Sequence, residues 1–140
     1  MGKVRENMKS LWSNMQIAFG AMGGFLGWFL GGIDGFLYAL TAFVIVDYLT
    51  GVMLAIIEKR VSSLVGARGI LKKVLIFTLV GVAHIVDSQI IGEGSAIRST
   101  VIFFYLSNEG ISILENTAKI GLPIPEKLKD ALEQLKEGKQ

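Results

Sequence analysis

The apolar stretch at residues 36–57 constrains this chain more than any other feature of its sequence. It contains one acidic residue, Asp47, and no basic residue, and it is followed at once by Glu58, Lys59 and Arg60. A helix of about 20 apolar residues crosses a hydrocarbon core about 30 Å thick and satisfies its own backbone hydrogen bonds there. We therefore expect a membrane-spanning helix. An ionised carboxylate near its middle costs about 3 kcal/mol, so Asp47 should meet protein or water.

The composition extends this expectation to the whole chain. Hydrophobic residues make up 51% of the 140 residues, and the mean hydropathy of +0.54 is high for a soluble domain. Seventeen glycines stand beside two prolines, as in closely packed membrane helices. Cysteine is absent, which excludes disulfides and thiolate zinc sites. The expected fold class is an all-α integral membrane protein.

The order of apolar and polar segments predicts about four membrane-spanning helices. The expected spans are residues 17–33, 36–57, 70–91 and 97–119. Residues 1–16 form a basic leader, cytoplasmic or interfacial, and residues 120–140 a cytoplasmic tail with a short amphipathic helix. The first two spans should form a tight hairpin, and residues 61–69 a loop. Three spans remain possible if the first or the fourth segment lies flat on the membrane.

Basic residues are distributed unevenly between the expected sides of the membrane. The leader has three, the connection from Lys59 to Lys73 has five, and the tail from Lys119 onward has five. The remaining connections hold Arg98 alone. Because short basic loops stay in the cytoplasm, this pattern favours both termini on the cytoplasmic side.

Glycines recur every three or four residues through the first expected span. They would leave one helix face nearly bare, open to another helix. Three interpretations stay open: self-association through this face, packing against the second span, or a flexible glycine-rich segment that is barely helical. The glycines are Gly20, Gly23, Gly24, Gly27, Gly31 and Gly35.

Polar side chains follow one face of the fourth expected span. At 100° per residue they form a stripe that cannot face lipid, so we expect it to line water in an oligomer or to lie at the interface. A single copy with four short helices has little interior for so many ionisable groups, which favours oligomerisation. The stripe consists of Arg98, Tyr105, Asn108, Glu109, Ser112, Glu115 and Asn116.

Asp47 begins a second polar strip, shared with Thr50, Gly51 and Glu58 on the same helix face. Two interpretations stay open. The carboxyl is buried between protomers while an assembly is closed and lines water once it opens, or it only fixes helix packing.

His84 and Asp87, three residues apart in the third expected span, predict a local hydrogen-bonded pair. One histidine without cysteines or a second ligand pair makes a poor metal site or catalytic centre. We expect no enzyme activity and no cofactor.

Several motifs together resemble the toxin-secretion/phage-lysis holin family over roughly residues 44–135. They are Asp47-Tyr48-Leu49-Thr50-Gly51, then Ser62-Ser63, Gly66 and Gly69 ahead of Lys72-Lys73, then Phe104-Tyr105-Leu106-Ser107-Asn108-Glu109, Ser112, Glu115-Asn116 and Gly121-Leu122-Pro123-Ile124-Pro125. The glycine-rich first span and the leader match only in kind.

This resemblance implies a small phage or prophage protein of the bacterial cytoplasmic membrane. It would homo-oligomerise and open pores or lesions that release an endolysin, or in some relatives a large toxin, without required contact with that cargo. Its partners would be itself and membrane lipid, not nucleic acid. In some phage holins a second start delays opening, which would make Met8 a second translation start here, but an incidental methionine is the favoured interpretation.

Two other functions fit the same composition. A small proton-coupled four-helix transporter dimer would use Asp47 or Glu109 as its coupling site. A passive membrane scaffold would leak nothing. Release of folded proteins distinguishes the holin from both.

Overall fold

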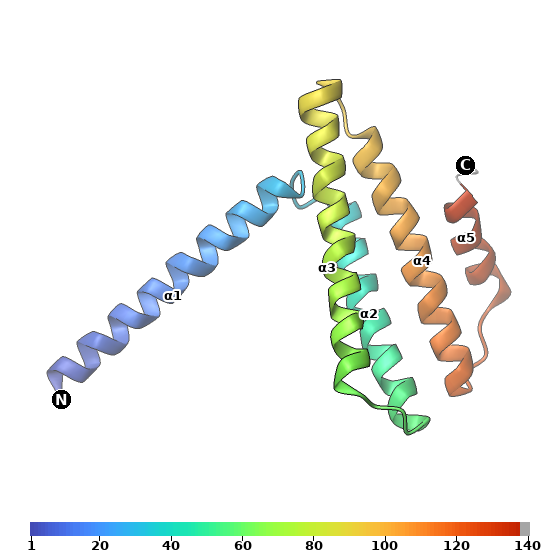
Figure 1. The fold of residues 1–140 in the computed structure, drawn as a ribbon, viewed down its shortest axis with the longest axis horizontal. Coiled ribbons are helices and arrows are strands. Elements are labelled where there is room, and N and C mark those ends of the chain that lie inside the picture. Colours follow the sequence, from blue (N-terminus) through green and yellow to red (C-terminus); the bar gives the residue numbers. More distant parts are fainter. Residues whose placement is uncertain (138–140) are drawn as a thin grey trace.

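The computed structural model describes residues 1–137, with side chains described as far as residue 134. This part of the chain is all-helical and contains no strand, which confirms the all-α part of the predicted fold class (Figure 1). The elements are α1 (Gly2–Phe29), α2 (Gly35–Ile57), α3 (Ser63–Ile85), a π-helical extension of α3 at Val86–Ile91, α4 (Ala96–Ile120) and α5 (Glu126–Glu137). Lys139 and the side chains of Leu135 and Lys136, expected in the tail, lie outside the described part.

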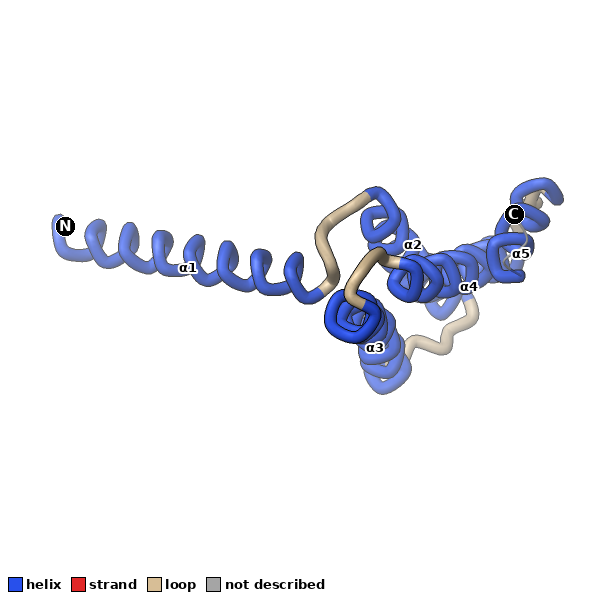
Figure 2. The backbone as a smooth tube through the Cα atoms, turned by 90° about the horizontal axis from the view of Figure 1, so that it is seen from above, coloured by secondary structure: helices blue, strands red, loops and turns tan. Residues whose placement is uncertain are grey.

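The core lies between α2, α3 and α4. Leu40, Val80 and Ile102, one from each helix, are fully buried in it. Viewed from above, α2, α3 and α4 form a compact group, with α1 leaving on one side and α5 lying on the other (Figure 2). Within the described residues, two helices have the length and hydropathy of membrane spans, α2 and α3 with its extension. These two are half of the four expected spans.

Helix α1 differs from its prediction. A leader at residues 1–16 followed by a separate span at 17–33 was expected, but Gly2–Phe29 is one continuous helix of 28 residues with no buried residue. It projects away from the other helices, so the expected hairpin with α2 is wrong (Figure 1). No proline interrupts this segment, and the chain instead turns at Gly31 and Gly32, whose φ values are +80° and +95°.

Helix α3 begins at Ser63, seven residues before the predicted start of the third span. Gly66 and Gly69 were interpreted as loop residues, but both lie in the helix and face Tyr48 of α2. A Cβ atom at either position would lie 3.6 Å from the tyrosine side chain. Such a contact is an ordinary van der Waals distance, and the predicted loop at residues 61–69 shrinks to the turn before Ser63.

Helix α5 folds back along α4 (Figure 1). Leu132 is buried, whereas Leu128 is 48% exposed. A Cβ atom at Gly110 of α4 would lie 2.9 Å from Leu132 and 3.1 Å from Phe43. The predicted amphipathic helix after Pro125 is confirmed, and Gly110 is the position that receives its buried leucine.

Candidate functional site

Three charged side chains from three helices meet at the centre of the helix group. The ammonium group of Lys73 on α3 donates hydrogen bonds to the carboxylates of Asp47 on α2 and Glu109 on α4. Asp47 and Glu109 are each 8% exposed. We call these residues the central charge cluster. With both acids ionised it has a formal charge of −1, so one lysine serves two carboxylates.

Polar groups on α2 and α4 complete the cluster. The side-chain amide of Asn116 donates to Asp47 Oδ1 over 3.3 Å and to Thr50 Oγ1 over 3.1 Å. Gly51 lies beside this amide, and a Cβ atom there would make an ordinary contact of 3.7 Å with Asn116 Nδ2. Among the described residues, every buried side-chain nitrogen and oxygen has a hydrogen-bond partner.

This arrangement corrects one step of the sequence argument. One copy was expected to be unable to shelter its ionisable groups, yet Asp47 and Glu109 find their partner within the same chain. A buried charge is tolerated where it is paired and hydrogen-bonded. Burial of these charges therefore gives no independent argument for oligomerisation.

A second polar site joins the start of α4 to the turn after α1. Arg98, 3% exposed, donates to the carbonyl oxygens of Leu30 (2.6 Å) and Gly32 (3.0 Å) and to Asp34 Oδ2 (2.6 Å). We call Arg98 with these partners the Arg98 clamp. It fixes the end of α1 relative to α4.

Asp34 also begins α2, where its carboxylate accepts a hydrogen bond of 2.9 Å from the Leu37 N–H. The hydrogen bond from Arg98 holds the pKa of Asp34 below its ordinary value, against the opposing effect of burial. Asp34 therefore stays ionised, and the clamp intact, at neutral pH.

The expected pair of His84 and Asp87 does not form. Asp87, 1% exposed, instead accepts hydrogen bonds from the backbone N–H groups of Ile97 (3.1 Å) and Arg98 (2.8 Å), and so caps α4. His84 lies beside Gly31, where a Cβ atom would meet its ring at 2.6 Å. In the part of the chain that the structure describes, no three His or acidic side chains group as a metal site.

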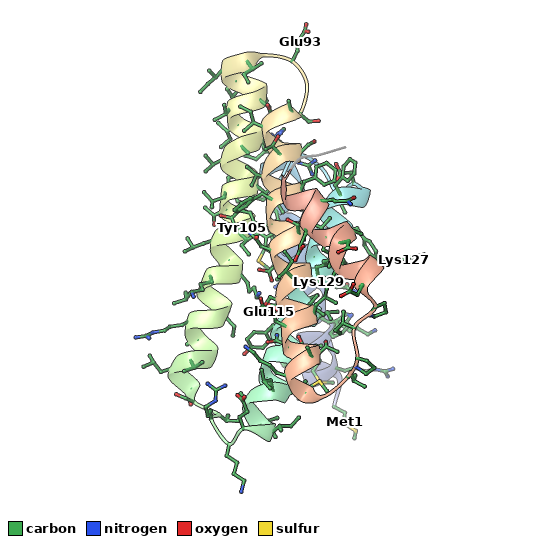
Figure 3. All side chains as sticks on the ribbon, turned by 90° about the vertical axis from the view of Figure 1, so that its right-hand side faces the viewer. Met1, Glu93, Tyr105, Glu115, Lys127 and Lys129 are labelled. Carbon is green, nitrogen blue, oxygen red and sulfur yellow. The ribbon has the colours of Figure 1, made fainter. Side chains whose placement is uncertain are left out.

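The predicted stripe on α4 faces these two sites and an open groove, which the central charge cluster also lines. The groove, of about 1120 Å³, lies between α2, α3 and α4 and is lined in part by Tyr105, Asn108 and Ser112. Figure 3 shows Tyr105 between α3 and α4, and Glu115 farther along α4. Glu115 is exposed. Most of the stripe thus faces protein or the groove, within one copy.

The remaining predicted residues lie outside both sites. Glu58 ends α2 and pairs with Arg60 at the surface, so it does not extend the Asp47 strip into the cluster. Met8 is exposed on α1. Gly31 lies in the turn, so the glycine face of α1 ends at Gly27. A Cβ atom would have no neighbour within 4 Å at Gly20, Gly23, Gly24, Gly27 and Gly35.

Sequence reasoning missed Lys73, Asp34 and Gly81. Lys73 was counted with the basic connection because the third span was expected to begin only at residue 70. A helix that begins at Ser63 places Lys73 about three turns inside it. Asp34 stood in the sequence as the only acid of a short link. Gly81 receives the Phe29 ring from α1, leaving no space for a side chain there, and nothing in the local sequence indicates this partner.

Comparisons with known proteins agree with the resemblance. A family model described as the bacteriophage holin family matches residues 24–137. An uncharacterised 14.9 kDa protein of Clostridium perfringens is 44% identical over 82% of this chain and 87% of its own length. An uncharacterised Listeria monocytogenes protein is 40% identical over 83% and 80% of the two chains. A probable holin of Bacillus phage phi105 is 40% identical over 63% and 64%. No solved structure matches the chain.

Proposed function

The chain belongs to the bacteriophage holin family, and from this membership we propose that it is a holin. It homo-oligomerises in the bacterial cytoplasmic membrane and opens lesions that release a cell-wall hydrolase or a large toxin. The observation that carries the proposal is the match itself, which covers α2, α3, α4 and α5. The phi105 relative, named a probable holin, supports it.

The distribution of charge supports a multi-pass orientation with both termini in the cytoplasm. The turn between α2 and α3, with Lys59 and Arg60, lies at one end of the helix group (Figure 1). At the opposite end, Figure 3 shows Glu93 in the connection before α4, and Asp34 lies in the other connection. The basic end belongs in the cytoplasm.

Oligomerisation draws its support from α1. This helix buries none of its residues, and its glycine face at Gly20, Gly23, Gly24 and Gly27 has open space around it. In lipid, small residues favour close helix association. A second copy of the same face is therefore the proposed partner.

Expression in a bacterium with and without a cytoplasmic muralytic enzyme tests the proposal. A holin should cause abrupt clearing of the culture only when the enzyme is present, because the lesion gives it access to the wall. Arrested growth without clearing in both strains would contradict enzyme release.

The central charge cluster favours one alternative, a small proton-coupled transporter. Two carboxylates, Asp47 and Glu109, share one lysine within the helix group, as a proton-binding site could. Substrate-specific uptake into vesicles driven by a pH gradient, without leakage of folded proteins, would support the transporter.

A further inference from the structure

Helix α5 lies against the middle of α4. Its buried Leu132 reaches Gly110, which is adjacent to Glu109 of the central charge cluster. Figures 1 and 3 both show α5 alongside α4 and not beyond its end. If α4 crosses the membrane, α5 therefore sits at the depth of the hydrocarbon core.

The outer side of α5 cannot face that hydrocarbon. Five of its charged side chains are exposed: Glu126, Lys127, Lys129, Asp130 and Glu133. Figure 3 shows Lys127 and Lys129 on the α5 side of the molecule. Charged side chains at the bilayer centre are strongly disfavoured unless they meet water or protein.

The outer surfaces of α2 and α3 have the opposite character. Most exposed side chains along them are large and apolar, including Ile45 and Leu49 on α2 and Leu71 and Leu75 on α3, although α3 also exposes Lys72. Seen from above, α5 lies beyond α4 on the side away from α3 (Figure 2). One flank of the protein thus suits lipid and another suits water, at the same depth.

We propose that α5 docked on α4 is the wall that each copy presents to water at the edge of an open lesion. This inference rests on the proposed holin function and deepens it. Most of the polar stripe of α4 meets other helices or lines the groove between α2, α3 and α4, whereas α5 carries its charged side chains on the outer surface of the protein. While a copy is surrounded by lipid, α5 detaches from α4 and lies in the cytoplasm. The connection Gly121–Pro125 keeps it attached to the end of α4.

A reversible disulfide tests whether an open lesion keeps α5 docked. The chain has no cysteine, so Gly110→Cys with Leu132→Cys introduces one pair, and the shorter side chain at 132 makes room for that at 110. The full-length protein, oxidised or reduced, is reconstituted into phosphatidylglycerol and phosphatidylethanolamine vesicles loaded with a folded fluorescent protein. We expect both forms to release it at rates within about twofold.

Retention by the oxidised form, with release restored by a reductant, would overturn the inference, because α5 would then have to detach for opening. If both forms retain the fluorescent protein while the parent chain releases it, the native contact between Gly110 and Leu132 is itself required for release. The leucine substitutions on α5 described below then decide whether docked α5 is needed. Retention by the parent chain would overturn the holin function and the inference together.

Two leucine substitutions provide the matched comparison. Leu132→Asp places a charge in the contact with Gly110 and should lower release at least tenfold. Leu128→Asp, on the same helix at a half-exposed position, should leave it unchanged. Equal release by the two variants would contradict a role for docked α5.

Discussion

At the scale of single residues, each of two cations, Lys73 and Arg98, stabilises several oxygen acceptors. Lys73 serves two acids, and Arg98 serves Asp34 together with two carbonyl oxygens. Each arrangement joins segments that are distant in the sequence. Because a buried charge without a partner is costly, the cations hold these segments in place.

Replacing Lys73 with methionine should destabilise the protein strongly. The change leaves two carboxylates side by side without a cation, and breaking a buried ion pair from one side costs about 3–5 kcal/mol. Unfolding in detergent, followed by circular dichroism, measures the loss. Lys72→Met is the control, because Lys72 is exposed on the same helix and should change stability by less than about 0.5 kcal/mol. Equal effects of the two variants would argue against a shared lysine.

The Asp34 pair should make stability depend on acid pH. The pKa of Asp34 is lower in the folded protein than its ordinary value of 3.8. Its contribution is therefore complete above that value and is lost as the pH falls through the lowered folded pKa. The difference in unfolding free energy between the parent protein and Asp34→Asn should be constant near neutrality and should shrink below about pH 4. A difference that stays constant down to about pH 2 would contradict this linkage.

At the scale of helices, prediction succeeded where the sequence pattern is local. The stretches predicted at 36–57 and 97–119 match α2 (Gly35–Ile57) and α4 (Ala96–Ile120) to within one residue at each end, since Asp34 and Gly121 bound them. It failed at the start of α3. Gly66 and Gly69 resembled a loop, but both lie in α3 against Tyr48, a contact with another helix that the local sequence does not indicate. The central charge cluster was predicted only in part: its acids stood out in apolar segments, but its lysine did not.

The position of α1 should depend on Gly81. The Phe29 ring occupies the space where a side chain at residue 81 would lie. Gly81→Leu should therefore displace the end of α1 and broaden the distribution of distances between α1 and α3. Spin labels on cysteines at Ser13 and Leu75 measure this, without background from other cysteines. Gly66→Ala is the control, because its new carbon would make an ordinary 3.6 Å contact with Tyr48. An unchanged distance distribution in Gly81→Leu would show that Phe29 does not orient α1.

At the scale of the whole molecule, two of its parts remain available for assembly. Helices α2, α3 and α4 pair their buried polar groups within one copy, whereas α1 buries none of its residues and α5 exposes its charges. The surfaces of α1 and α5 are therefore free, within one copy, to contact lipid, water or further copies. Association should therefore depend on α1 and not on the central charge cluster.

Filling the glycine face of α1 should impair assembly without unfolding the protein. Gly24→Leu places a large side chain where a second helix would approach, while the open space around Gly24 within one copy makes the change harmless to the fold. We expect fewer chemically cross-linked oligomers in membranes and a delay in the onset of lysis. Ala18→Leu is the matched control, since residue 18 lies on the opposite face of the same exposed helix. If the two variants cross-link equally and lyse together, another surface must join the copies, and the outer faces of α2 and α3 become the candidates.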